Sequence, residues 1–180
     1  VTSIGNNAFS GCKSLIQITI PPSVTSIGNN AFSGCNLLTK IEIPSSVAEI
    51  REGAFRLCSS LEEIILPTSI KTISESLFSE CSSLIQIEIP SSVTEIKKNA
   101  FQRCKLITKV KLPESLIHIG SGAFSYCTSL NEIIIPPKVQ TIESLAFYFC
   151  CSLKQINLHE SVTFIGISAF YKCDFTEITI

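Results

Sequence analysis

The sequence predicts an α/β repeat solenoid, in which each repeat adds one short strand to a parallel sheet and returns through a short helical or 3₁₀ turn. Three observations support this fold class. One phenylalanine and one cysteine recur with a constant spacing of 23 residues, each repeat ends on alternating apolar residues, and a proline follows most of these endings. A period of this length is typical of units that stack because none can bury its apolar face alone.

The period extends over the whole chain of 180 residues. Phenylalanine occupies the same place in every unit: Phe9, Phe32, Phe55, Phe78, Phe101, Phe124, Phe147 and Phe170. A cysteine stands three residues after each of them: Cys12, Cys35, Cys58, Cys81, Cys104, Cys127, Cys150 and Cys173. The units are 1–23, 24–46, 47–69, 70–92, 93–115, 116–138, 139–161 and 162–180. The sequence therefore predicts a single domain of eight units, which we expect to be part of a longer array.

The elements of a unit follow from its spacing, as the second unit illustrates. From Ile27 to Leu38 the apolar residues lie three to five positions apart, which is typical of a helical turn or a short 3₁₀ segment. Leu38, Ile41 and Ile43 then end the unit with strand-like alternation. Pro44 follows, and because proline lacks an N–H group it ends the strand. Successive strands should pair in parallel on the concave face of an arc, with the helical turns on its convex side.

The unit ending L-x-x-I-x-I is the core phrase of a leucine-rich repeat, and a longer phrase narrows the match. Residues 89–107 read IPSSVTEIKKNAFQRCKLI, and comparable phrases recur along the chain. The chain closely resembles the BspA-like leucine-rich repeat, also called the Treponema pallidum type, with proline where other leucine-rich repeats carry asparagine. The resemblance implies a leucine-rich repeat horseshoe without enzymatic activity or cofactor. It also implies a surface or secreted protein of a mucosal bacterium or protozoan parasite, of a kind implicated in adhesion to host matrix proteins, host cells or other microbes.

Charge and hydropathy exclude two classes of partner. Lysine and arginine total 14 against 15 acidic residues, and the longest like-charge blocks are the pairs 62–63 and 97–98. The chain therefore has no basic footprint for nucleic acid and no polybasic patch for a membrane surface. Apolar runs such as 133–135 are far shorter than the roughly 18 residues that a spanning helix needs. We expect no nucleic-acid partner and no membrane insertion of this segment.

Eight of the nine cysteines share one column, and the ninth, Cys151, lies outside it. A zinc site needs four ligands that converge on one point, whereas a column presents its members in single file. Disulfides between equivalent positions are disfavoured, because parallel side chains hold their Cβ atoms near the strand spacing of about 4.8 Å, above the preferred separation of about 3.8 Å. We predict nine free thiols, the column packed as small buried hydrophobes, with some bridging between units as the alternative. Cys151 is the one candidate for an exposed, reactive thiol.

Residues that could support catalysis are few and scattered. The two histidines, His118 and His159, occupy different columns and have no cysteine or carboxylate at a motif spacing. The sequence also lacks a glycine-rich phosphate loop, an HExxH motif and a calcium loop. We therefore predict that the chain is not an enzyme, with no catalytic residue, no metal site and no cofactor.

The candidate binding residues are the side chains that flank the central apolar residue of each predicted strand. They point outward onto the concave sheet, and they vary between units while the core columns hardly change, as expected of a binding surface on a fixed scaffold. These residues are Gln17, Thr19, Lys40, Glu42, Glu63, Ile65, Gln86, Glu88, Lys109, Lys111, Glu132, Ile134, Gln155 and Asn157. Their mixed, nearly neutral character favours a protein as the partner.

The alternative is a solvated β-surface that binds nothing. Opposite charges face each other in the predicted register, in three pairs: Lys40 and Glu63, Glu88 and Lys111, and Lys109 and Glu132. Such pairs stabilise a sheet by about 0.2–1 kcal/mol each without any ligand. The sequence alone leaves both interpretations open.

The leading hypothesis is a non-catalytic protein-recognition solenoid, a cell-surface or secreted adhesin module that binds host-cell, matrix or microbial surface proteins through its concave face. The alternative is an intracellular, cytoplasmic scaffold or signalling repeat, which free cysteines suit equally well. At the end of the chain, Phe175 and the final strand would leave an unpaired edge. We expect either a longer array or end-to-end self-association through these ends.

Overall fold

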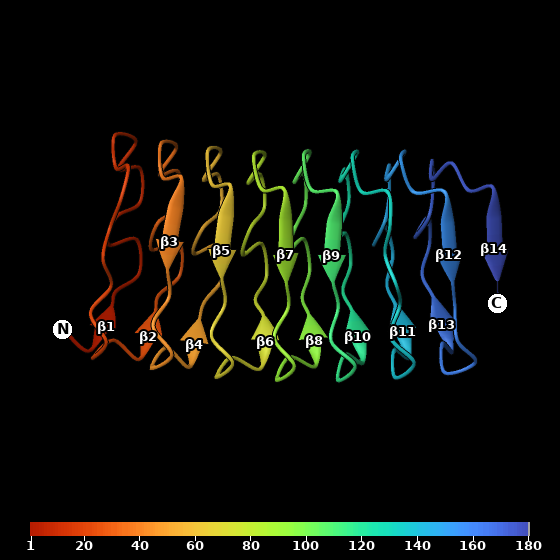
Figure 1. The fold of residues 1–180 in the computed structure, drawn as a ribbon, viewed down its shortest axis with the longest axis horizontal. Helices are drawn as coiled ribbons and strands as arrows, with labels where there is room; N and C mark the ends of the chain where they lie inside the picture. The colour runs from red at the N-terminus through yellow and green to blue at the C-terminus, as the bar shows by residue number, and fades with distance from the viewer. Residues whose placement is uncertain (180) are drawn as a thin grey trace.

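The computed structural model describes residues 1–179, which form a solenoid of stacked coils (Figure 1). Each coil contains a two-residue strand: β1 (Ser3–Ile4), β2 (Ser26–Ile27), β4 (Glu49–Ile50), β6 (Thr72–Ile73), β8 (Glu95–Ile96), β10 (His118–Ile119), β11 (Thr141–Ile142) and β13 (Phe164–Ile165). Six coils also contain a three-residue strand: β3 (Lys40–Glu42), β5 (Glu63–Ile65), β7 (Gln86–Glu88), β9 (Lys109–Lys111), β12 (Gln155–Asn157) and β14 (Glu177–Thr179). The repeat solenoid predicted from the sequence is confirmed.

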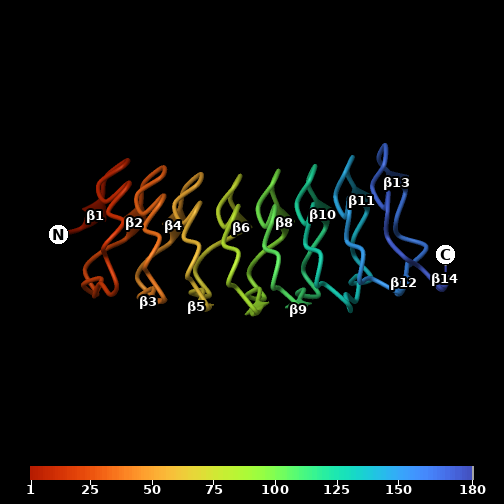
Figure 2. The same cartoon turned by 90° about the horizontal axis from the view of Figure 1, so that it is seen from above.

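Strands of successive coils pair in parallel, and the register is the 23-residue period itself. Ile41 pairs with Ile64, for example, and Ile27 with Ile50. The two-residue strands form the sheets β1-β2-β4 and β13-β11-β10-β8-β6, and the three-residue strands pair as β3-β5, β7-β9 and β12-β14. Seen from above, the coils form a gently bent row, with the three-residue strands along one long side (Figure 2). In this arrangement each outward residue of one coil lies beside its equivalent in the next.

The predicted helical return is wrong, because residues 1–179 contain no helix. A two-residue strand takes its place and is followed by a series of tight turns. In the second unit Asn30 and Gly34 have φ angles of +52° and +73°, and the equivalent residues of the other units also have positive φ. Left-handed backbone at two places within five residues cannot continue a right-handed helix. The three-to-five-residue spacing of the apolar side chains comes from these turns.

Hydrogen bonds between coils replace those that a helix would make within itself. The N–H groups of Asn30, Phe32 and Gly34 donate to carbonyls of the next coil at 2.8 Å each. The intervening N–H of Ala31 donates back to Gly28 at 3.3 Å and closes a turn. Alternate N–H groups thus point along the solenoid axis, and the turn segments stack almost as regularly as strands.

The core consists of columns that run along the solenoid axis. The eight phenylalanines stack in one file, with centroids 5.2 to 5.9 Å apart and interplanar angles of 2° to 19°. Ala31, Phe32, Cys35 and Leu38 of the second unit are fully buried, as are their equivalents in the following units up to the seventh. Stacking therefore supplies the burial that a single unit lacks.

The cysteines of the column pack as small apolar side chains and also form hydrogen bonds between coils. The thiol of Cys58 donates to the carbonyl of Phe32 in the preceding coil at 3.2 Å, and that carbonyl also accepts the N–H of Cys35 at 3.1 Å. The same thiol bond recurs at every column cysteine from Cys35 to Cys173, at 3.1 to 3.2 Å. All nine cysteines are free thiols, as predicted. Cys12 is exposed like Cys151, so Cys151 is not the single exposed thiol.

Candidate protein-binding face

The outward side chains of β3, β5, β7, β9 and β12, and their equivalents in the first and sixth units, form what we call the strand face. The central residue of β3, β5, β7, β9 and β12 is buried, and both of its neighbours are exposed. In the first and sixth units, Thr19 and Glu132 join the row through single bridges to Glu42 and Lys109. All fourteen residues that the sequence proposes as a binding surface are exposed, and the parallel register sets them side by side.

Much of the charge on the strand face is neutralised within the face itself. Ammonium and carboxylate groups of adjacent coils meet in the three pairs expected from the register: Lys40–Glu63 at 3.5 Å, Lys109–Glu132 at 3.5 Å and Lys111–Glu88 at 2.6 Å. All six side chains are more than half exposed, so each pair contributes about 0.2–1 kcal/mol. These pairs fix the direction of long side chains more than they stabilise the fold.

Two apolar side chains stand out of this polar surface. Ile65, the third residue of β5, is 63 % exposed, and Ile134, its equivalent in the sixth unit, is 71 % exposed. Their neighbours in the same column are charged or polar, so they are separate apolar contacts. Glu42 adjoins Ile65 in register and has no cation within 4.0 Å among residues 1–179. A partner would thus meet two isolated isoleucines within a nearly neutral surface.

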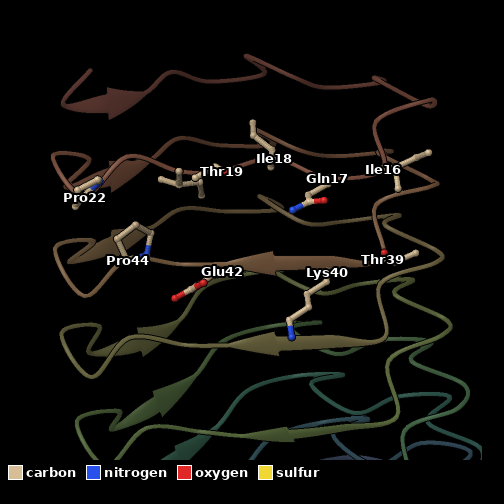
Figure 3. A pocket seen from close by; sticks show the side chains of 10 residues that line it. Ile16, Gln17, Ile18, Thr19, Pro22, Thr39, Lys40, Glu42 and Pro44 are labelled. Atoms are coloured by element: carbon tan, nitrogen blue, oxygen red, sulfur yellow. The ribbon is translucent and has the colours of Figure 1, made fainter.

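Three shallow hollows run along the strand face where the proline loops rise beside the strands. The first, of about 520 Å³, lies over the first two coils, with Gln17 and Lys40 toward one end and Pro22 and Pro44 at the other (Figure 3). The second, of about 630 Å³, is lined by side chains from Glu63 to Lys111 and includes Ile65. The third, of about 430 Å³, includes Ile134. Ile65 and Ile134 therefore each line a hollow.

The loop residues of these hollows were missing from the set chosen on the sequence. Pro44, Pro90 and Pro136 line the hollows together with Glu114 and His159. The prolines recur with the 23-residue period, so this signal is present in the sequence, but the period by itself indicates only that proline ends each strand. The candidate face is therefore wider than the strands and includes the loops beside them.

A second polar group that sequence spacing did not reveal lies on the two-residue strands. His118 contacts the Thr141 hydroxyl through Nδ1, and its Nε2 lies 3.4 Å from the Glu143 carboxylate. The other oxygen of Glu143 accepts the Ser121 N–H at 3.0 Å. The register brings together residues 23 and 25 apart, which a search for short motifs overlooks. None of the three hollows is lined by these residues, and the group links adjacent coils.

Burial controls the chemistry of the thiols. Desolvation is the main cause that raises the pKa of Cys35 to about 11 and of Cys58 to about 12, and the neighbouring cysteine adds to it in each case. Protonated thiols are poor nucleophiles and poor metal ligands. Among residues 1–179 no group of three or more His, Cys, Asp or Glu side chains could hold a metal ion. Over the same range no helix is long and apolar enough to cross a membrane.

Comparison with known proteins agrees with the 23-residue coils. A family model described as "BspA type Leucine rich repeat region" matches residues 1–107 and 72–180, which together span the chain. The chain belongs to the BspA-type leucine-rich repeat family. The family resemblance drawn from the residues is therefore confirmed. No curated protein sequence matches this BspA-type domain.

Solved structures share the architecture of the BspA-type domain. A leucine-rich repeat protein from Bacteroides ovatus is 36 % identical, with a TM-score of 0.92 over 99 % of this chain and 46 % of its own length. The leucine-rich repeat protein of Treponema pallidum is 35 % identical, with a TM-score of 0.69 over 97 % of this chain and 71 % of its own. A leucine-rich cell surface protein from Faecalibacterium prausnitzii is 26 % identical, with a TM-score of 0.53 over 99 % and 76 %. The chain spans about half the length of the Bacteroides protein.

Proposed function

We propose that this BspA-type domain is a non-catalytic recognition module, displayed at the cell surface or secreted, that binds host-cell, matrix or microbial surface proteins through the strand face. One observation carries the proposal. The strand face presents fourteen exposed and varied side chains on coils whose buried columns hardly change, and its two exposed isoleucines lie in hollows. Side chains that vary on a constant scaffold are what a binding surface requires.

The similar structures support the proposed cell-surface location and do not identify a ligand. The similar Faecalibacterium structure is described as a leucine-rich cell surface protein, and 26 % identity over nearly the whole domain makes the comparison relevant. Leucine-rich repeat domains in general bind proteins through such extended surfaces. The near-neutral strand face with isolated apolar contacts suits a folded protein surface, whose contacts combine apolar anchors with polar rims.

The test is capture of partners by the immobilised 180-residue domain from host-cell surface and matrix extracts, followed by cross-linking to locate the contacts. The decisive variant is Ile65→Glu combined with Ile134→Glu, and the matched control is Ile117→Glu, an exposed isoleucine 41 % accessible outside the strand face. We expect binding to be lost in the double variant and kept in the control. Unchanged binding in the double variant would refute the assignment to the strand face. Labelling of the full-length protein only after cells are permeabilised would instead favour an intracellular scaffold.

We also propose that the 180-residue domain self-associates through its last coil. Phe164, Ile165, Ile167 and Ile178 are 44 to 81 % exposed there. In the preceding coil, where the next unit covers the stack, the equivalents of Ile165 and Ile178 are buried, Ile142 at 0 % and Ile156 at 4 % exposure. A second copy could cover the last coil by continuing the stack. Sedimentation over a range of concentrations should show oligomers that Ile167→Asp combined with Ile178→Asp dissociates. A strictly monomeric domain would contradict this proposal and leave the strand-face proposal intact.

A further inference from the structure

All three tyrosines of the chain lie in one surface cluster, built by the turn segments of the last three units. Tyr126 stacks on Phe149 with 5.1 Å between ring centroids, and Tyr148 stacks on Tyr171 with 5.2 Å. Tyr148 and Phe149 join the two stacks at 4.7 Å. We call these four residues the tyrosine cluster. It belongs to the positive-φ turn segments and is separate from the strand face.

Two cationic side chains lie against the outer rings of the tyrosine cluster. The Arg103 guanidinium carbon lies over the Tyr126 ring, 5.6 Å from its centroid, and the Lys172 ammonium lies 5.8 Å from the Tyr171 centroid. The face of an aromatic ring carries the negative part of its quadrupole, and here ring faces are engaged by other rings and by cations. What the cluster offers to a partner is therefore ring edges, which are positive, and phenol hydroxyls. Tyr171 is 49 % exposed and the other three rings are half-buried.

Positive charge is concentrated around this cluster. The turn segments 97–105, 120–128, 143–151 and 166–174 carry five cations, which are Lys97, Lys98, Arg103, Lys105 and Lys172. Their two carboxylates are both engaged, Glu143 by the Ser121 N–H and His118, and Asp174 by Lys154. Among residues 1–179, Lys98 is the one cation of the five with a carboxylate within 4.0 Å, at 3.9 Å from Glu75. The equivalent segments of the first four units carry three charges of each sign, in a chain of net charge −1.

We propose that the tyrosine cluster, with Arg103 and Lys172, is a second binding surface for an acidic protein segment in which carboxylates alternate with aromatic or aliphatic side chains. Carboxylates would accept hydrogen bonds from the guanidinium and the phenol hydroxyls, and the apolar side chains would pack on the ring edges. Tyrosine and arginine are, with tryptophan, the residue types enriched among strongly contributing interface residues. A single-stranded nucleic acid would instead need open ring faces for base stacking, and here these faces are engaged.

Tyrosine fluorescence reports on this surface alone, because the chain has no tryptophan and no tyrosine outside the cluster. The probe is a synthetic peptide that alternates glutamate and phenylalanine, titrated into the 180-residue domain at low salt. One control peptide has serine for phenylalanine, and the other has lysine for glutamate. We expect a saturable fluorescence change with the first peptide, weaker binding at high salt, and weaker binding of both controls. No saturable change with the first peptide would overturn the proposal.

The matched variants separate this surface from general charge attraction. Arg103→Gln combined with Lys172→Gln should weaken binding of the peptide by about tenfold. Lys13→Gln combined with Lys71→Gln removes the same charge from exposed sites elsewhere and should change binding less than about twofold. Equal effects of the two double variants would overturn the proposal. So would equally tight binding of oligothymidylate, or of vesicles of anionic phospholipid, to the unmodified domain.

Discussion

The thiol of Cys81 provides a direct test of what the cysteine column does. This thiol is fully buried and donates to the Phe55 carbonyl of the preceding coil at 3.1 Å. Two substitutions distinguish the role of the thiol as a hydrogen-bond donor from its role as a buried apolar group. Cys81→Ala removes both the donor and the sulfur volume, whereas Cys81→Ser removes the volume and keeps a donor.

The expected magnitudes follow from the contacts. Cys81→Ala loses about 1 kcal/mol of apolar burial and a thiol hydrogen bond of about 0.5–1 kcal/mol. The Phe55 carbonyl keeps its bond from the Cys58 N–H at 3.2 Å, so no buried acceptor is left unpaired. Cys81→Ser loses similar burial, but its hydroxyl can restore a bond worth about 1 kcal/mol. We expect the serine variant to be at least as stable as the alanine variant.

The free energy of unfolding is measured by urea titration with circular dichroism, and the slope must be unchanged, because repeat arrays can unfold in parts. If the thiol acted only as a hydrophobe, serine would bury an unpaired hydroxyl and be less stable than alanine by about 1–3 kcal/mol. That order of stability would refute the donor role. Cys12 is the matched control, because it is exposed and the thiol bonds found among residues 1–179 begin only at Cys35, so its alanine and serine variants should both be neutral.

Three further predictions concern the thiols and the turns. In the native protein near about pH 8, a thiol reagent should modify Cys12 and Cys151 rapidly and reach all nine cysteines only after unfolding. Burial raises the pKa of Cys58 from 9.0 to about 12, so its contribution to the free energy of unfolding is complete below pH 9.0 and is lost as the pH rises toward about 12. The free energy of unfolding is measured by denaturation at several pH values in that range, for the unsubstituted chain and for Cys58→Ala. It should fall more steeply with pH for the unsubstituted chain, and equal slopes would contradict this prediction. Ser76→Gly should stabilise by about 0.5–1 kcal/mol, because Ser76 has φ of +53° and glycine adopts it freely. Gly53→Ser in the same column should destabilise by about 1–2 kcal/mol, because its φ of +61° is one that only glycine adopts without strain. Shifts of the unfolding midpoint in the same direction for both variants would contradict the strain argument.

Most of the fold followed from the sequence because a repeat transmits its geometry by stacking. Once Ile41 and Ile64 are placed in equivalent positions, the parallel register and the facing of Lys40 and Glu63 follow without further information. The same reasoning placed all fourteen strand-face residues on the exposed side. The stacking of coils does not determine whether that face binds a partner, so binding stays a prediction.

The return segment could not be predicted from apolar spacing, since turns and helices share a spacing of three to four residues. The informative residues were Asn30 and Gly34, which tolerate positive φ and so indicate turns. The His118–Glu143 contact and the Cys58 hydrogen bond were missed for another reason. The first joins residues 25 apart and the second residues 26 apart, rather than residues one 23-residue period apart. These contacts therefore depend on the side-chain conformations between coils, which the repeat period does not predict.

One column shows how the scaffold separates stability from recognition. The last positive-φ position of each unit is occupied by glycine, leucine, glutamate, arginine, tyrosine, phenylalanine or lysine, yet its φ stays between +59° and +73°. Left-handed backbone costs a non-glycine residue about 1–2 kcal/mol, so the local preference is overridden at six of these eight positions. The N–H of Phe149 illustrates the compensation, because it donates to Tyr171 in the next coil at 2.8 Å whatever side chain it carries. Because the bond between coils at this position involves only the backbone, the outward side chain there is free to change, and the tyrosine cluster can acquire a partner without altering the core.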